Sequence, residues 1–299
     1  MDKSTLSNYG WIVIVTLVLA VMLALATPFG TYVGKGASNV IKTFVQSSDN
    51  AVDEDNIDTQ STDWDIYLNN DEYNHKGVIP EGGTYIDVNG NTYTKGDSFP
   101  NPQIDDLYKY GDYVYTYKEA SPAGFWKEGW AVQVKDTTLT TYGCVLEKIA
   151  NKDVVSLVGC FRDCANLEKL NDNFRIPKTV THCGSMFANC SNLKELPTGF
   201  TIPDGAQLCM QMFRGCSSLT LKEALEFPHS VTRYAGIFQN CTNLTGTIIF
   251  NRNDLNYTLL STTFVYTTQP IILKAPAGTI NEIKGSFTSL YPNMTLEIL

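Results

Sequence analysis

The chain has 299 residues, of which 43% are hydrophobic and 18% charged, a composition that excludes wholesale disorder and collagen-like structure. The formal charge of −9 arises in one region: residues 49–150 hold 19 acidic and 7 basic side chains, whereas residues 151–299 hold 11 and 12. Because there is no basic run to release phosphate counterions, nucleic acid is not an expected partner. The three histidines lie in no metal or catalytic-triad motif, so we predict no enzyme activity, no metal and no cofactor.

The first 48 residues predict a membrane helix followed by an amphipathic stem. Residues 11–29 contain no charge and would form a helix of about 28 Å, close to the thickness of a bilayer core. Apolar residues recur at helical spacing from Val33 to Val45, which indicates that a helix continues beyond the apolar run.

Three interpretations of this segment remain open: a cleaved secretory signal, an uncleaved anchor and a pilin-like stem. A signal is suggested by Ala24-Leu25-Ala26. Close helix packing is suggested by the small residues Ala26, Gly30 and Gly34, four apart. The stretch YGWIVIVTLVLAVMLALATPFG resembles the stem of Flp-type pilins, which implies a homo-oligomer or filament formed through residues 11–48. In each case we expect the C-terminus outside the cell.

The next two segments predict an acidic linker over residues 49–77 and a small antiparallel β module over residues 78–135. The linker is polar and acidic, as solvated spacers are. The module has hairpin signals at Asn89-Gly90 and Gly111-Asp112, because these residues tolerate positive φ.

The β module is rich in aromatic residues, which have two interpretations. Such rings can stack on sugars, but tyrosine is also a favourable strand residue in a half-buried sheet. The candidate ligand-binding residues are Tyr108, Tyr110, Tyr113, Tyr115, Trp126 and Trp130.

The second half contains a repeat with phenylalanines at spacings of 26, 26, 25 and 26 residues. A fixed period of this length predicts stacked units that bury a common core. The predicted core columns are Phe161, Phe187, Phe213 and Phe238; Cys164, Cys190, Cys216 and Cys241, three residues later; and Leu167, Leu193, Leu219 and Leu244, six residues later. The fifth unit, at Phe264, has Thr267 and Pro270 at the last two places.

The unit IPKTVTHCGSMFANCSNLKELP resembles the BspA-like leucine-rich repeats of bacterial surface proteins, over about residues 140–299. The resemblance implies a right-handed solenoid of short parallel strands and turns or helices that serves in adhesion. The expected fold class is therefore mainly β with short helices. It comprises the long N-terminal helix, the β module, and a solenoid of four to five 26-residue units with caps over residues 136–299.

All eight cysteines lie between residues 144 and 241, and three states are open for them. Six share repeat positions, since Cys183 and Cys209 both lie four residues before a phenylalanine. They can be buried free thiols, bridges between neighbouring units, or metal ligands.

The predicted function is that of a membrane-tethered adhesion or ligand-recognition protein on a bacterial surface, bound to an extracellular protein or glycan. The alternative is a pilin-like structural subunit that polymerises through its N-terminal helix.

Overall fold

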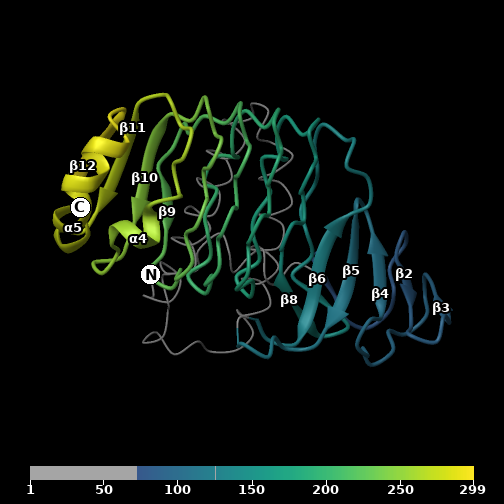
Figure 1. The fold of residues 1–299 in the computed structure, drawn as a ribbon. Coiled ribbons are helices and arrows are strands. Elements are labelled where there is room, and N and C mark those ends of the chain that lie inside the picture. The colour runs from purple at the N-terminus through teal and green to yellow at the C-terminus, as the bar shows by residue number, and fades with distance from the viewer. Residues whose placement is uncertain (1–72, 125) are drawn as a thin grey trace, which may run out of the picture. The chain divides into compact units, whose positions relative to one another are not determined.

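The computed structural model describes residues 73–124 and 126–299 (Figure 1). They belong to one compact unit that spans residues 68–299. They form an eight-stranded and a four-stranded sheet. The strands are β1 (Asn74–His75), β2 (Thr84–Ile86), β3 (Thr92–Tyr93), β4 (Leu107–Tyr110), β5 (Tyr113–Lys118), β6 (Gly129–Val134), β7 (Lys148–Ile149), β8 (Lys152–Ser156), β9 (Leu225–Phe227), β10 (Gly246–Phe250), β11 (Ile271–Ala275) and β12 (Met294–Ile298). The helices in these residues are α4 (Tyr257–Leu260) and α5 (Ala277–Leu290).

The eight-stranded sheet has the order β1-β7-β8-β6-β5-β4-β2-β3. Strands β2 to β6 pair antiparallel, whereas β6 pairs in parallel with β8. The sequence predicts that the β module ends at residue 135 and that the repeat region begins at residue 136. This boundary lies between β6 and β8, which pair in one sheet. Strand β1 lies inside the range 49–77 that the sequence predicts to be a linker, and it pairs in parallel with β7.

The tyrosines of β5 point into the core, while the residues between them are only partly buried. Their hydroxyl groups bind the segment that follows β6: Tyr113 donates to the carbonyl of Gly143 at 2.5 Å, and Tyr115 accepts from the Leu146 N–H at 3.0 Å. These bonds satisfy polar groups that would otherwise be buried without partners. The aromatic side chains therefore attach the sheet to the start of the repeats.

Between β8 and β9 the repeat units consist of turns that bond to one another in register (Figure 1). The N–H of Phe161 donates to the carbonyl of Met186 at 2.8 Å, and Phe187 donates to Met212 at the same distance. This register stacks the phenylalanine rings: Phe161 and Phe187 are 5.1 Å apart and Phe187 and Phe213 are 5.3 Å apart between centroids. The column continues through Phe238 to Phe264.

The structure corrects the predicted leucine-rich repeat solenoid over residues 136–299. The described chain is mostly β with few helices and forms a curled, half-barrel sheet, not a clear solenoid of that class. The physical reason is local: residues two before and two after each of the first four repeat phenylalanines have positive φ, as in Ser185 and Asn189. A left-handed residue interrupts a strand. The units between Ser156 and Arg233 are therefore joined by isolated parallel bridges.

The cysteine and leucine columns are fully buried along these turns. Three of the cysteines donate their thiol to a phenylalanine carbonyl of the preceding unit: Cys190 to Phe161 at 3.0 Å, Cys216 to Phe187 at 3.1 Å and Cys241 to Phe213 at 2.9 Å. A small apolar side chain with a weak donor suits this place. In the fifth unit the Thr267 hydroxyl instead donates to the carbonyl of its own Phe264.

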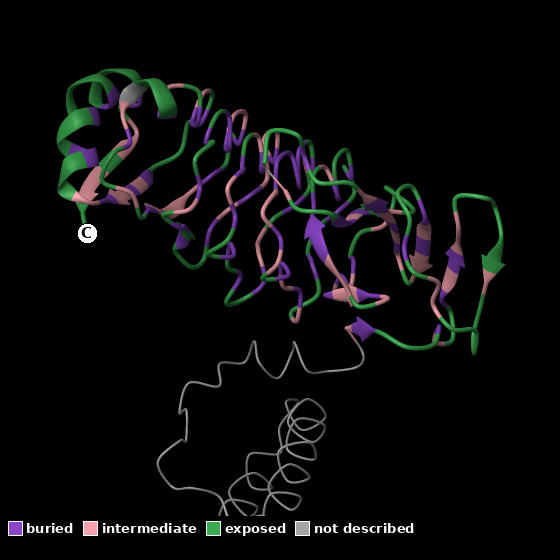
Figure 2. Cartoon of the chain, turned by 90° about the horizontal axis from the view of Figure 1, so that it is seen from below, coloured by how far each residue is buried: buried purple, intermediate pink, exposed green. Residues whose placement is uncertain are grey.

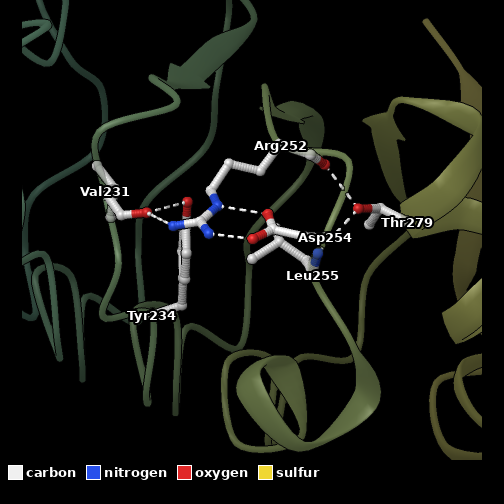
Figure 3. A network of polar contacts seen from close by, with 6 residues as sticks. All are labelled: Val231, Tyr234, Arg252, Asp254, Leu255 and Thr279. Carbon is white, nitrogen blue, oxygen red and sulfur yellow. Dashed lines mark hydrogen bonds and ion pairs between the residues drawn. The ribbon is translucent and has the colours of Figure 1, made fainter.

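At the C-terminal end, the parallel strands β9, β10, β11 and β12 form the second sheet. Helix α5 packs on β11 and β12, and buried and exposed residues alternate along it (Figure 2). Arg252 links the segment after β10 to the preceding unit, because its guanidinium bonds to the carboxylate of Asp254 and to the Val231 carbonyl (Figure 3). The Thr279 hydroxyl of α5 donates to the Arg252 carbonyl at 2.6 Å and accepts from the Leu255 N–H at 3.2 Å.

The predicted membrane helix and stem over residues 1–48 lie outside the described residues, as do Ala26, Gly30 and Gly34. Across residues 73–124 and 126–299, no helix has the length and apolarity of a membrane span.

Glu147 is the most unfavourably placed carboxyl group in the described chain. It is 1% exposed, and neither of its carboxylate oxygens hydrogen-bonds to a described residue. Burial, and then the nearby charge of Asp153, raise the pKa of Glu147 to about 7, although Lys148 and Lys178 act in the opposite direction. The folded state therefore favours the protonated carboxyl group.

We expect Phe213→Ala to lower the free energy of unfolding by about 3–5 kcal/mol, because it removes a ring stacked on both sides in a close-packed core. Urea unfolding followed by circular dichroism measures this loss. Tyr266→Ala is the control, because that ring is 69% exposed and should change stability by less than about 0.5 kcal/mol. Equal losses in the two variants would contradict the stacked core.

We expect Glu147 to make stability fall as pH rises from about 4.5 to 7. A group whose pKa is raised on folding stabilises the fold below its unfolded pKa, and this contribution is lost as pH passes the folded pKa. The loss is on the order of 3 kcal/mol. The difference in urea stability between wild type and Glu147→Gln should therefore change over this range, and parallel curves would contradict the assignment.

Candidate functional site

The structure separates the six aromatic residues that the sequence suggests for ligand binding. Tyr108, Tyr113, Tyr115 and Trp130 are at most 2% exposed and lie in the core, so they offer no stacking face to a ligand. Tyr110 and Trp126 are partly exposed, but they pack on different histidines: Tyr110 on His75 and Trp126 on His182. The six rings therefore do not form one platform, and Trp126 is the candidate that joins a surface built by the repeats.

Trp126 lies on the loop between β5 and β6, and this loop is closed by its own hydrogen bonds. The indole N–H donates to the Glu119 carbonyl at 3.2 Å, and the Ser121 N–H donates to the Trp126 carbonyl at 3.0 Å. The indole ring packs at an angle of 55° against the ring of His182, with 5.4 Å between centroids. A loop of the β module thus meets the second repeat unit at the molecular surface.

His182 is held in one orientation by the backbone beside it. Its Nδ1 accepts a hydrogen bond from the Gly184 N–H at 3.1 Å. A Cβ atom on Gly184 would lie 2.7 Å from the ring carbon Cε1, so this orientation requires glycine. Burial lowers the pKa of His182 to about 4, so the ring is neutral near pH 7. Because Nδ1 is the acceptor, the proton is on Nε2, which leaves one ring N–H as a donor.

Two apolar side chains extend this surface along the repeats. Val158 and Met210 are 36% and 42% exposed, and both lie three residues before a repeat phenylalanine. Gly184 lies between them in register, because the Gly159 N–H donates to Gly184 and the Ser185 N–H donates to Met210. We call Trp126, Val158, His182 and Met210 the Trp126 surface. It combines an aromatic ring, apolar side chains and a neutral hydrogen-bond donor.

Sequence reasoning missed three members of this surface, although a signal for them exists. The residue four before each repeat phenylalanine is buried, as Leu157, Cys183, Cys209 and Tyr234 show. Side chains alternate between the two faces of an extended segment. The residues on either side, five and three before the phenylalanine, therefore point away from the core. His182, Val158 and Met210 occupy these positions, whereas Ser156 and Leu208 occupy equivalent positions but are covered.

A second surface feature is a shallow groove of about 270 Å³ lined by Thr140, Thr141, Glu168, Lys169, Lys194 and Glu195. Its charges are largely paired. The Lys194 ammonium lies 2.8 Å from the Glu168 carboxylate, and this hydrogen bond lowers the pKa of Glu168. Lys222 pairs with Glu195 in the same way. The groove is smaller than typical small-molecule pockets and has no single sign of charge, so it is a weaker candidate than the Trp126 surface.

The described cysteines are poor candidates for nucleophilic catalysis. Seven of the cysteines are buried, and burial is the main cause that raises the pKa of the thiols of Cys160, Cys190 and Cys216. A high pKa disfavours the nucleophilic thiolate. Within residues 73–124 and 126–299, no three His, Cys, Asp or Glu side chains are grouped so that they could hold a metal ion.

Comparison of the chain with protein-family models, curated proteins and solved structures finds no match.

We expect Trp126→Ala to raise the pKa of His182 from about 4 towards its ordinary value near 6.5, because the indole covers the imidazole and excludes water. Titration of the ring Cε1 proton by NMR measures both values. Trp126→Phe is the control, since a smaller aromatic ring retains part of the cover. An unchanged His182 titration in Trp126→Ala would contradict the contact.

Proposed function

We propose that this chain is a non-enzymatic recognition protein, tethered to the membrane of a bacterial cell with its C-terminal part outside. The uncharged run over residues 11–29 supports the tether. The resemblance of the repeated motif to those of BspA-like surface proteins supports the location. In this proposal the ligand is an extracellular protein or glycan, and residues 73–299 supply the binding surfaces.

The observation that carries the proposal is the packing of Trp126 on His182 beside the exposed side chains of Val158 and Met210. Aromatic rings with a polar neighbour are the typical anchors of binding sites, because they bury a large area at a small entropic cost. The neutral His182 ring adds a donor that does not depend on pH near neutrality. A sugar ring or a peptide with an apolar face and an acceptor at its edge matches this chemistry.

The backbone beneath the surface favours tight binding, because it is already ordered. The β5–β6 loop is closed by its own hydrogen bonds, and the repeat units are joined by parallel bridges at Ser156, His182 and Leu208. Binding to such a surface orders few additional groups and so costs less conformational entropy.

We expect the full-length protein in detergent micelles to bind one class of ligand when it is tested against immobilised glycans and extracellular-matrix proteins by interferometry. Trp126→Ala should weaken that binding by roughly 30-fold, the effect of losing a binding hot spot. Binding should be unchanged between pH 6 and 8, because the His182 ring remains neutral over this range.

Tyr266→Ala is the matched control, because Tyr266 is a more exposed aromatic residue of the fifth repeat unit. If Trp126→Ala and Tyr266→Ala weaken binding equally, or if neither changes it, the Trp126 surface is not the binding site. If the protein binds neither class of ligand, the recognition function itself is wrong.

A further inference from the structure

Cys183 and Cys209 occupy equivalent places in neighbouring repeat units. Each lies four residues before a repeat phenylalanine, and each is fully buried. The residues just before them, His182 and Leu208, form a parallel bridge, and the Cys183 N–H donates to the Leu208 carbonyl at 2.8 Å. The two side chains therefore point to the same side of adjacent backbone segments.

The spacing of the two cysteines is compatible with a disulfide bond. Neighbouring strands in register lie about 4.8 Å apart, and the Cα atoms of bridged cysteines are usually separated by about 4.4–6.8 Å. Both residues are free thiols in this structure. Hydrogen bonding with Cys183, followed by burial, raises the pKa of the Cys209 thiol, which indicates that the two sulfur atoms are neighbours.

The column that contains the pair holds two cysteines only. Its members in the first four units are Leu157, Cys183, Cys209 and Tyr234. Each thiol in this column therefore has a single cysteine neighbour within the column. No other cysteine of this column competes for either thiol when the disulfide bond forms.

The other cysteine column differs in what its thiols already bind. Cys190 and Cys216 each donate to a phenylalanine carbonyl of the preceding unit. A disulfide between them would remove both of these donors from the buried carbonyl groups, which is unfavourable. The hydrogen bonds thus make the two columns chemically different, although both repeat with the same period.

We propose that Cys183 and Cys209 are a redox site, at which a disulfide oxidant such as oxidised glutathione converts the two thiols into a disulfide bond. This bond, called the staple below, joins the second and third repeat units. The thiolate of one cysteine attacks the oxidant and releases one glutathione thiolate, leaving a mixed disulfide. The thiolate of the other cysteine then displaces the second glutathione. Two thiols are oxidised, one disulfide is reduced, and the two cysteine protons pass through solvent to the released thiolates. Burial of both cysteines restricts this reaction to chains in which the units open locally.

The staple would close a loop between residues 183 and 209, which spans one repeat. Restricting the unfolded chain in this way shifts the folding equilibrium towards the native state by on the order of 100-fold. The disulfide bond would also resist separation of the two units, which are otherwise held together by backbone hydrogen bonds and side-chain packing. This inference does not depend on the identity of the ligand or on the Trp126 surface.

The test uses the full-length protein in detergent micelles, purified reduced and then incubated with a series of glutathione redox mixtures. After alkylation of the remaining thiols, tryptic cleavage after Lys194 and Arg214 separates the two cysteines, and mass spectrometry without reduction detects linked peptides. We expect peptide 179–194 to be linked to peptide 195–214, and oxidised protein to resist urea better than reduced protein. Alkylation of both cysteines at every glutathione ratio would overturn the proposal.

Peptide 179–194 also contains Cys190, so two matched variants identify the bridging residue. Cys190→Ala should retain the linked peptides, and Cys183→Ala should lose them together with the gain in urea resistance. A link that persists in Cys183→Ala, or a link that lowers the resistance of the wild type to urea, would contradict the staple. If Cys183→Ala fails to fold, Cys209→Ala provides the same comparison from the other side of the bond.

Discussion

The structure of the second half depends on backbone hydrogen bonds that pass from one repeat unit to the next. Each unit consists of turns with left-handed residues, such as Ser185 and Asn189, and turns of this kind leave backbone groups without partners inside the unit. Buried N–H and C=O groups must nevertheless be paired. The N–H of Phe187 therefore bonds to the unit that follows, and its carbonyl accepts the thiol of Cys216. A single unit would lose both bonds, so the units are stable only when they are stacked.

The same constraint explains how the two ends differ from the middle. At the start, the Tyr142 hydroxyl donates to the Asp136 carbonyl and lies 3.5 Å from the sulfur of Cys164. Strand β8 connects the first unit to the sheet of the β module. At the other end, the fifth unit replaces the cysteine by Thr267, and α5 covers β11 and β12. Both ends thus use side chains or elements that the middle units do not contain.

Polar groups in the core also separate structural residues from candidate binding residues. The hydroxyls of Tyr113 and Tyr115 and the indole N–H of Trp130 bond to residues 143–149, so these rings join two parts of the chain. Trp126 instead bonds within its own loop and places its ring on His182. The surface proposed for recognition therefore lies where the β module and the repeats meet. The redox site proposed at Cys183 and Cys209 lies beneath it, in the buried column of the same units.

Features that depend on local spacing and turn chemistry can be predicted from the residues alone. The period of the phenylalanines places them in one column, and Asn89-Gly90 lies at the turn where β2 and β3 pair antiparallel. Long-range contacts establish whether the repeats are strands or turns and which face of the β module is buried. They also bring Trp126 to His182, 56 residues further along the chain. Periodicity states which residues are equivalent, whereas backbone conformation and contacts depend on partners distant in the sequence. The predicted leucine-rich repeat solenoid is wrong for this reason, because left-handed residues two positions before and after each of the first four repeat phenylalanines interrupt the short parallel strands that the resemblance implies.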